Sequence, residues 1–176
     1  MAHSEMNLNL EQLLEQIYTG ISRKLQNLDP EDVVMIGIHT GGFWIAEKIY
    51  QCLNLPTPLG SLNISFYRDD FTKIGLHPDV KPSQLPAGLD DKHIILIDDV
   101  LFTGRTIRAA LNEIFDYGRP ASVTLAVLLD RGERELPICA EITGQKISLK
   151  PDQQVKLTGP EPLQLTLVEK PVENLI

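Results

Sequence analysis

Cysteine is scarce in this sequence, and no apolar run approaches the length needed to cross a membrane. The two cysteines, Cys52 and Cys139, lack the spacing of a metal site, so we expect both to be buried apolar residues without a disulfide. The amino terminus has no basic segment followed by an apolar one, which argues against a secretory or transit peptide. These absences favour a protein of the reducing cytoplasm with no membrane partner.

Positive charge is also in short supply. The 16 Lys and Arg residues against 24 Asp and Glu residues give a net charge of −8. This balance disfavours broad, sequence-independent attraction to nucleic acid. A strongly anionic ligand would therefore need cations gathered at its site, or Mg²⁺. The remaining composition, 43 % hydrophobic over 176 residues, suits one compact domain spanning residues 1–176.

Segments of strand type alternate with segments of helix type along the chain. Short apolar, β-branched runs at 33–38, 93–97 and 122–129 are typical of strands buried on both faces. Three-and-four spacing of apolar residues predicts helices over 8–28, from the loop 39–42 to residue 53, and over 107–117. The last helix is expected to turn Ile107, Leu111, Ile114 and Phe115 inward. A half-exposed strand is expected over 62–67, with short β-like pieces over 138–142, 155–157 and 163–168.

The charged segment 68–89 contains Pro78, Pro82, Pro86 and Gly88 and is too long for an ordinary connection. We interpret it as a flexible functional loop. The alternation around it predicts a three-layer α/β domain, with a mostly parallel central sheet, helices on both faces and a small β-rich hood formed by the C-terminal strands. Ligands of such sheets bind at the carboxyl ends of the strands.

One uninterrupted run carries the chemistry. The strand 94–97 leads into Asp98-Asp99, and Thr103-Gly104-Arg105-Thr106 follows one short loop later, before a helix. Neighbouring carboxylates can accept hydrogen bonds from two vicinal hydroxyls or hold a hydrated Mg²⁺. Hydroxyls, backbone N–H groups and a helix amino terminus together suit a phosphate, and a glycine allows close approach of the backbone. The two sites match the two ends of a ribose 5-phosphate.

Asp98-Asp99 taken alone also fits a response-regulator fold or simple helix capping. The following turn is what favours the sugar-phosphate interpretation. A P-loop would need a Gly-Lys-Ser/Thr ending, which is absent, as are a dinucleotide fingerprint and the motifs of nucleophilic serines and zinc sites.

The run from Ile94 to Thr106 resembles the phosphoribosyl pyrophosphate (PRPP) signature of the type I phosphoribosyltransferases. Together with the segments 65–70, 118–122 and 130–138, it is similar to the branch that couples uracil phosphoribosyl transfer to regulation of pyrimidine messenger RNA. The resemblance implies the three-layer fold over roughly 8–168, transfer of ribose 5-phosphate from PRPP to uracil with Mg²⁺, and UMP and pyrophosphate as products. It also implies a homodimer or higher homo-oligomer and, in some members, UMP-dependent binding to a pyrimidine leader RNA.

The resemblance also implies roles for particular residues. The catalytic residues would be Asp98, Asp99 and Arg68, with Asp99 as the metal ligand, directly or through water. PRPP would be bound by Thr40, Gly41, Gly42, Val100, Leu101, Phe102, Thr103, Gly104, Arg105 and Thr106. The flexible loop would include Tyr67, Asp69, Asp70 and Lys73. The base would lie beside Phe102, Asp130, Arg131 and Gly132.

One position distinguishes this chain from related purine enzymes, and two features depart from the pattern of close relatives. Related purine enzymes often have an aspartate where this chain has Phe102, which favours a pyrimidine. Close relatives often read Lys-Thr-Arg-Gly where this chain reads His39-Thr40-Gly41-Gly42, and they carry arginine at the position of Cys139. The departures leave an alternative open: a nucleotide-sensing RNA-binding regulator with little or no catalytic activity.

Overall fold

A five-stranded sheet forms the centre of the computed structural model, which describes residues 8–64 and 82–169. The strand order is β2-β1-β3-β4-β5, and every neighbouring pair is parallel. The strands are β1 (Val33–Ile38), β2 (Gly60–Leu62), β3 (His93–Leu101), β4 (Ser122–Asp130) and β5 (Ile142–Lys146). This is the mostly parallel central sheet that the sequence predicts.

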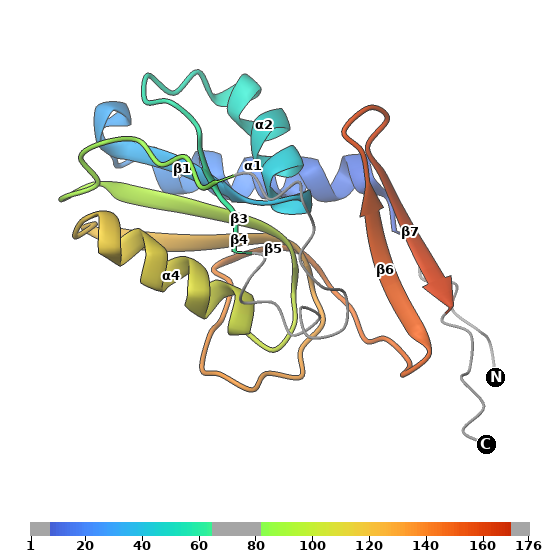
Figure 1. Ribbon diagram of the computed structural model, residues 1–176. Coiled ribbons are helices and arrows are strands. Elements are labelled where there is room, and N and C mark those ends of the chain that lie inside the picture. Colours follow the sequence, from blue (N-terminus) through green and yellow to red (C-terminus); the bar gives the residue numbers. More distant parts are fainter. Residues whose placement is uncertain (1–7, 65–81, 170–176) are drawn as a thin grey trace.

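Helices cover both faces of the sheet. Helices α1 (Leu10–Leu25) and α2 (Gly41–Leu53) pack on one face, and α4 (Arg105–Tyr117) lies on the other (Figure 1). A short 3₁₀ turn, η1 (Pro30–Asp32), leads into β1. The apolar stripe of α1 buries Leu13, Ile17 and Ile21 against the sheet, because three-and-four spacing places them on one helix face. The predicted three-layer arrangement is confirmed.

The C-terminal strands form a separate antiparallel hairpin, made of β6 (Gln153–Thr158) and β7 (Gln164–Glu169). It stands beyond one end of the central sheet (Figure 1). We refer to this β6–β7 hairpin as the hood. Among the described residues, no helix is both long enough and apolar enough to span a membrane.

Two element boundaries differ from the sequence prediction in ways that affect the site. The acidic pair was expected in a loop, but β3 continues to Leu101, and Asp98 is in register with Val127 of β4. Pairing with β4 along this extension outweighs the low strand preference of aspartate. The expected loop 39–42 is shorter than predicted, because Gly41 already begins α2.

The region around β2 also differs. A half-exposed strand was expected over 62–67, whereas the described strand is Gly60–Leu62 and all of it is buried. Residues 65–81, which hold most of the expected loop 68–89, lie outside the described residues. The end of that loop is anchored, because Gln84 bridges to Ser61 and Leu89 is fully buried.

Three side chains predicted to be buried are exposed. Phe115 is 54 % exposed on α4 because it follows the buried Ile114 directly, and consecutive helix positions face different directions. Cys52 and Cys139 are free thiols, as expected, but both are exposed.

Candidate functional site

The acidic pair lies near the carboxyl end of β3, at the edge of the sheet where α2 and α4 begin. Asp98 is only 2 % exposed, and its Oδ1 accepts a hydrogen bond from the backbone N–H of Asp99 at 3.0 Å. Oδ1 of Asp99 accepts one from the N–H of Val100 at 2.9 Å. Strand pairing and these bonds hold both carboxylates on a rigid part of the fold.

The first turn of α2 packs directly against the acidic pair. A β-carbon added at Gly42 would stand 2.6 Å from the carbonyl oxygen of Ile97 and 2.8 Å from the Cα of Asp98. Glycine is therefore what allows this approach. Thr40 precedes the helix without a side-chain capping bond. The free N–H groups of a helix start and its dipole make this a position suited to an anion.

The turn between β3 and α4 offers a second such position. Gly104 has φ +94°, in the left-handed region that glycine adopts readily, and α4 begins at the next residue. The hydroxyl of Thr103 accepts a hydrogen bond from the backbone N–H of Arg105 at 3.3 Å. Two helix starts, those of α2 and α4, thus flank the acidic pair at one edge of the sheet.

A pocket of about 390 Å³ joins the acidic pair, the turn and the hood. Its lining combines residues from all three: Asp98, Asp99, Val100, Leu101, Phe102, Thr103, Gly104, Thr106, Ile107, Arg131, Gln154, Val155, Lys156 and Leu157. The four residues of β6 were not predicted as site residues. The alternating sequence pattern of β6 predicts a strand, but it does not indicate which distant part of the chain that strand contacts. Lys156 is the notable addition, because it brings a cation to a pocket lined by carboxylates and hydroxyls.

Arg131 and Phe102 form the side of the pocket next to the carboxyl end of β4. The guanidinium carbon of Arg131 lies 3.9 Å from the centroid of the Phe102 ring, a cation–π contact. The backbone N–H of Arg131 donates to the carbonyl oxygen of Leu101 at 2.9 Å. Its side-chain Nε is buried and has no hydrogen-bond partner among the described residues. A ligand acceptor could satisfy this donor.

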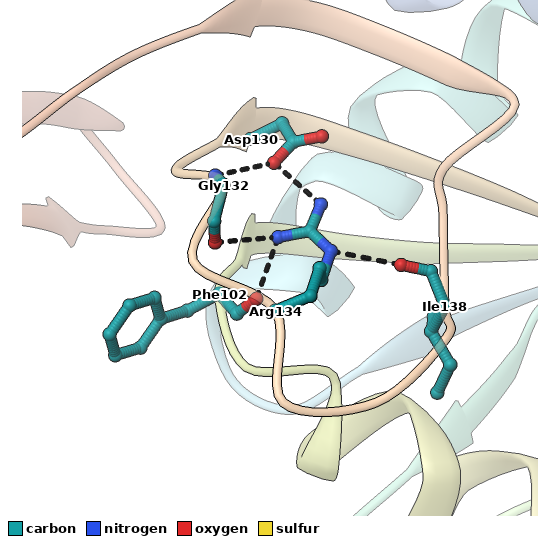
Figure 2. Close-up of polar contacts among 5 residues, drawn as sticks. All are labelled: Phe102, Asp130, Gly132, Arg134 and Ile138. Atoms are coloured by element: carbon teal, nitrogen blue, oxygen red, sulfur yellow. Dashed lines mark hydrogen bonds and ion pairs between the residues drawn. The ribbon is translucent and has the colours of Figure 1, made fainter.

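The guanidinium of Arg134 forms hydrogen bonds on several sides, one of them to the backbone of Phe102 (Figure 2). Its Nη1 donates to the carbonyl oxygens of Phe102 at 2.6 Å and Gly132 at 2.9 Å, and its Nε donates to that of Ile138 at 2.9 Å. Its Nη2 pairs with Oδ1 of Asp130 at 2.6 Å. Burial alone would raise the pKa of Asp130, but hydrogen bonds from the Gly132 N–H and Arg134, with the charges of Arg134 and Lys146, hold this pKa below its ordinary value.

Several predicted site residues lie beside the pocket and do not line it. Asp130 and Gly132 belong to the bonded loop around Arg134. The Nε of Arg105 pairs with Glu135 at 2.6 Å. Gly41 and Gly42 reach the site through the contact of α2 with the acidic pair, and Thr40 directly precedes them. Tyr67, Arg68, Asp69, Asp70 and Lys73 lie outside the described residues.

The donor set suits a hydrated divalent cation. Within residues 8–64 and 82–169, no cluster of three or more His, Cys, Asp or Glu side chains could hold a metal ion by itself. Mg²⁺ does not need such a cluster, because it commonly binds through one or two carboxylates, substrate phosphates and water. Asp98 and Asp99, next to two anion positions, fit that mode of binding.

Comparison with known proteins gives a consistent result. Residues 6–164 match the family model of the phosphoribosyl transferase domain. The chain is 56 % identical over 164 residues to the bifunctional protein PyrR of Nitrosococcus oceani, covering 92 % of this chain and 93 % of the relative. It is 53 % identical over 159 residues to the protein of the same name from Pseudomonas syringae pv. tomato, covering 90 % and 94 %.

Solved structures share the fold. A hypoxanthine-guanine phosphoribosyltransferase from Bacillus anthracis has a TM-score of 0.64 at 20 % identity, over 84 % of this chain and 86 % of that one. The hypoxanthine phosphoribosyltransferase of Trypanosoma cruzi, solved with its product IMP, has a TM-score of 0.57 at 20 % identity, over 78 % and 73 %. At this identity the likeness concerns the fold alone.

Proposed function

The chain belongs to the phosphoribosyl transferase family, and on this premise we propose that it transfers ribose 5-phosphate from PRPP to uracil, giving UMP and pyrophosphate. The observation that carries the proposal is the arrangement of one pocket: an acidic pair on β3, a hydroxyl-lined turn at the start of α4, and the Arg131–Phe102 stack beside them.

The sugar and its phosphate would be held by β3 and the turn that follows it. Asp98 and Asp99 can accept hydrogen bonds from the two ribose hydroxyls. Thr103, Gly104, Arg105 and Thr106 can surround the 5-phosphate with hydroxyls and backbone N–H groups at the helix start. Val100 and Leu101 line the same pocket between these two positions.

The pyrophosphate would lie at the start of α2, where Thr40, Gly41 and Gly42 present a helix amino terminus. As the bond at the anomeric carbon breaks, negative charge grows on the leaving pyrophosphate, and donors already in place stabilise it without rearranging. Mg²⁺ held through Asp99, directly or through water, would supply further positive charge there. Residues 154–157 of the hood line the pocket and would help to keep water from the ribose carbon.

The base would lie against Arg131 and Phe102, near Asp130 and Gly132. The buried Nε of Arg131 needs an acceptor, and leaving such a donor unsatisfied costs about 1–3 kcal/mol. Uracil provides two carbonyl oxygens on a flat ring that can meet this edge of the pocket. Phe102 offers no carboxylate to the ring nitrogens of a purine.

Conversion of labelled uracil tests the proposal. We expect UMP to form when uracil, PRPP and Mg²⁺ are all present, and no product with hypoxanthine or guanine under the same conditions. Absence of UMP would overturn the enzyme assignment, and activity on a purine without activity on uracil would overturn the base assignment.

A regulatory role in pyrimidine gene expression is part of the same proposal. Its support is the identity above 50 % to proteins that are named bifunctional. We expect UMP to tighten binding to a pyrimidine leader transcript at physiological salt, relative to an unrelated RNA of equal length. An affinity for the leader transcript that does not change on adding UMP, or that equals the affinity for unrelated RNA, would overturn this role. UMP-dependent RNA binding without UMP formation would favour the alternative, a nucleotide-sensing RNA-binding regulator with little or no catalytic activity.

We also propose a cellular location and an oligomeric state for the protein. A cytoplasmic homodimer or higher homo-oligomer is the form implied by the resemblance to the family. Sedimentation velocity at micromolar concentration tests the assembly, and a monomer would contradict it.

A further inference from the structure

Arg134 is absent from the pocket lining, yet it bonds to both segments that carry the Arg131–Phe102 stack. One bond goes to the carbonyl oxygen of Phe102 itself. Another goes to the carboxylate of Asp130, the residue that precedes Arg131. The ring of Phe102 points away from Arg134 (Figure 2), so the guanidinium of Arg134 holds the backbone while the ring keeps its contact with Arg131.

The same segment is bonded to the turn at the start of α4. We call residues 131–138 the base-side loop. The backbone N–H groups of Glu135 and Leu136 donate to the carbonyl oxygen of Thr103 at 3.0 and 3.2 Å. The side chain of Glu135 pairs with Arg105. We call the turn at residues 103–106 the phosphate turn. The base-side loop and the phosphate turn therefore form one bonded unit, which includes the partly buried bonds of Arg134.

We propose that Arg134 is a positioning residue that keeps the Arg131–Phe102 stack in register with the phosphate turn. The base and the phosphate of one ligand are then recognised together as a unit. This inference rests on the proposed function, because it assumes that a base lies on the stack while a phosphate lies in the turn.

Arginine suits this task for a geometric reason. Its planar guanidinium reaches four acceptors, the carbonyl oxygens of Phe102, Gly132 and Ile138 and the carboxylate of Asp130. A lysine ammonium carries the same charge at one point and cannot span acceptors arranged around a fork. Charge alone should therefore not replace Arg134.

The test compares two ligands: UMP, which carries a base, and ribose 5-phosphate, which does not. Dissociation constants of UMP and ribose 5-phosphate are measured by calorimetry for the wild-type chain, Arg134→Lys and Arg134→Gln. Arg119→Lys is the matched control, because Arg119 hydrogen-bonds through its backbone N–H and carbonyl oxygen to Asp90 and Asp91, away from the pocket. The preference for UMP over ribose 5-phosphate should fall by about tenfold or more in both Arg134 variants. Affinity for ribose 5-phosphate should change less than about threefold, and the control should match the wild type.

The two ideas fail in different ways. Absence of UMP formation by the wild-type chain overturns the proposed function. A preference for UMP that survives in both Arg134 variants, or equal weakening of both ligands, overturns the positioning role. If Arg134→Gln does not fold, Asp130→Asn weakens one bond of the same network and should lower the preference in the same direction.

Discussion

A β-carbon added at Gly41 would lie 2.8 Å from the Cγ of Asp99, closer than such atoms can approach without something moving. Gly41→Ala should therefore push α2 away from the acidic pair. Overpacking of this kind costs about 1–3 kcal/mol, and we expect kcat/KM for PRPP to fall about tenfold or more. Steady-state kinetics check this, with circular dichroism to show that the variant is folded.

Gly118→Ala is the control for this substitution. Gly118 follows α4, and its added β-carbon would meet its nearest atoms at 3.2 Å, in Leu89 and Asp90. Equal kinetic losses in both variants would show that the contact between Gly41 and Asp99 has no special importance.

Phe102→Leu removes the aromatic face beneath Arg131 but keeps an apolar side chain. A cation–π contact contributes about 0.5–2 kcal/mol, so we expect KM for uracil to rise about 3- to 30-fold while KM for PRPP changes less. Phe115→Leu, on the exposed face of α4, should leave both constants unchanged. If KM for PRPP alone rises in Phe102→Leu, the base does not lie on this ring.

Lys156 on β6 brings a cation from the hood to the same pocket as the phosphate turn. Lys156→Gln should raise KM for PRPP about threefold at low salt, an effect that shrinks as salt screens the charge. The control is Lys150→Gln, at an exposed position before β6. An identical salt dependence of KM in Lys156→Gln and the wild-type chain would contradict this role.

The lowered pKa of Asp130 makes the contribution of Arg134 to stability depend on pH. Because the folded-state pKa lies below the unfolded value, the stabilisation is fully present above about pH 4 and is lost as pH falls through the folded-state pKa. Arg134→Gln should lower the free energy of unfolding by about 2 kcal/mol at pH 7, and this deficit should narrow below about pH 4. Urea unfolding at several pH values measures it.

Lys92→Gln is the comparison for the pH experiment. It removes an ion pair with the exposed Asp32, whose carboxyl pKa is lowered chiefly by the hydrogen bond from Lys92. Its effect should be smaller, since water screens exposed pairs. A deficit in Arg134→Gln that stays constant from pH 7 to pH 3 would show that the pair with Asp130 is not its source.

Much of the fold could be predicted because local patterns determine it. The apolar, β-branched runs became β1, β3 and β4, and the run from Asp98 to Thr106 lies at the predicted edge of the sheet. Strand pairing, however, carries β3 on to Leu101, and this depends on a neighbour that no local pattern reveals.

The remaining parts of the site come from long-range packing. The β6 pattern predicts a strand, but its place over the pocket depends on contacts with distant residues. Arg134 lies in a charged run that equally fits a solvated turn. Its importance appears only when the carbonyl oxygens of Phe102 and Ile138 are brought around it.

Titration of PRPP into the double variant Asp98→Asn, Asp99→Asn tests most directly whether the acidic pair and the phosphate turn hold the two ends of one sugar. We expect PRPP affinity to fall at least about 100-fold, because the two carboxylates proposed to accept hydrogen bonds from the ribose hydroxyls are lost, and UMP formation to cease. The account is contradicted if the folded double variant binds PRPP and forms UMP as the wild-type chain does.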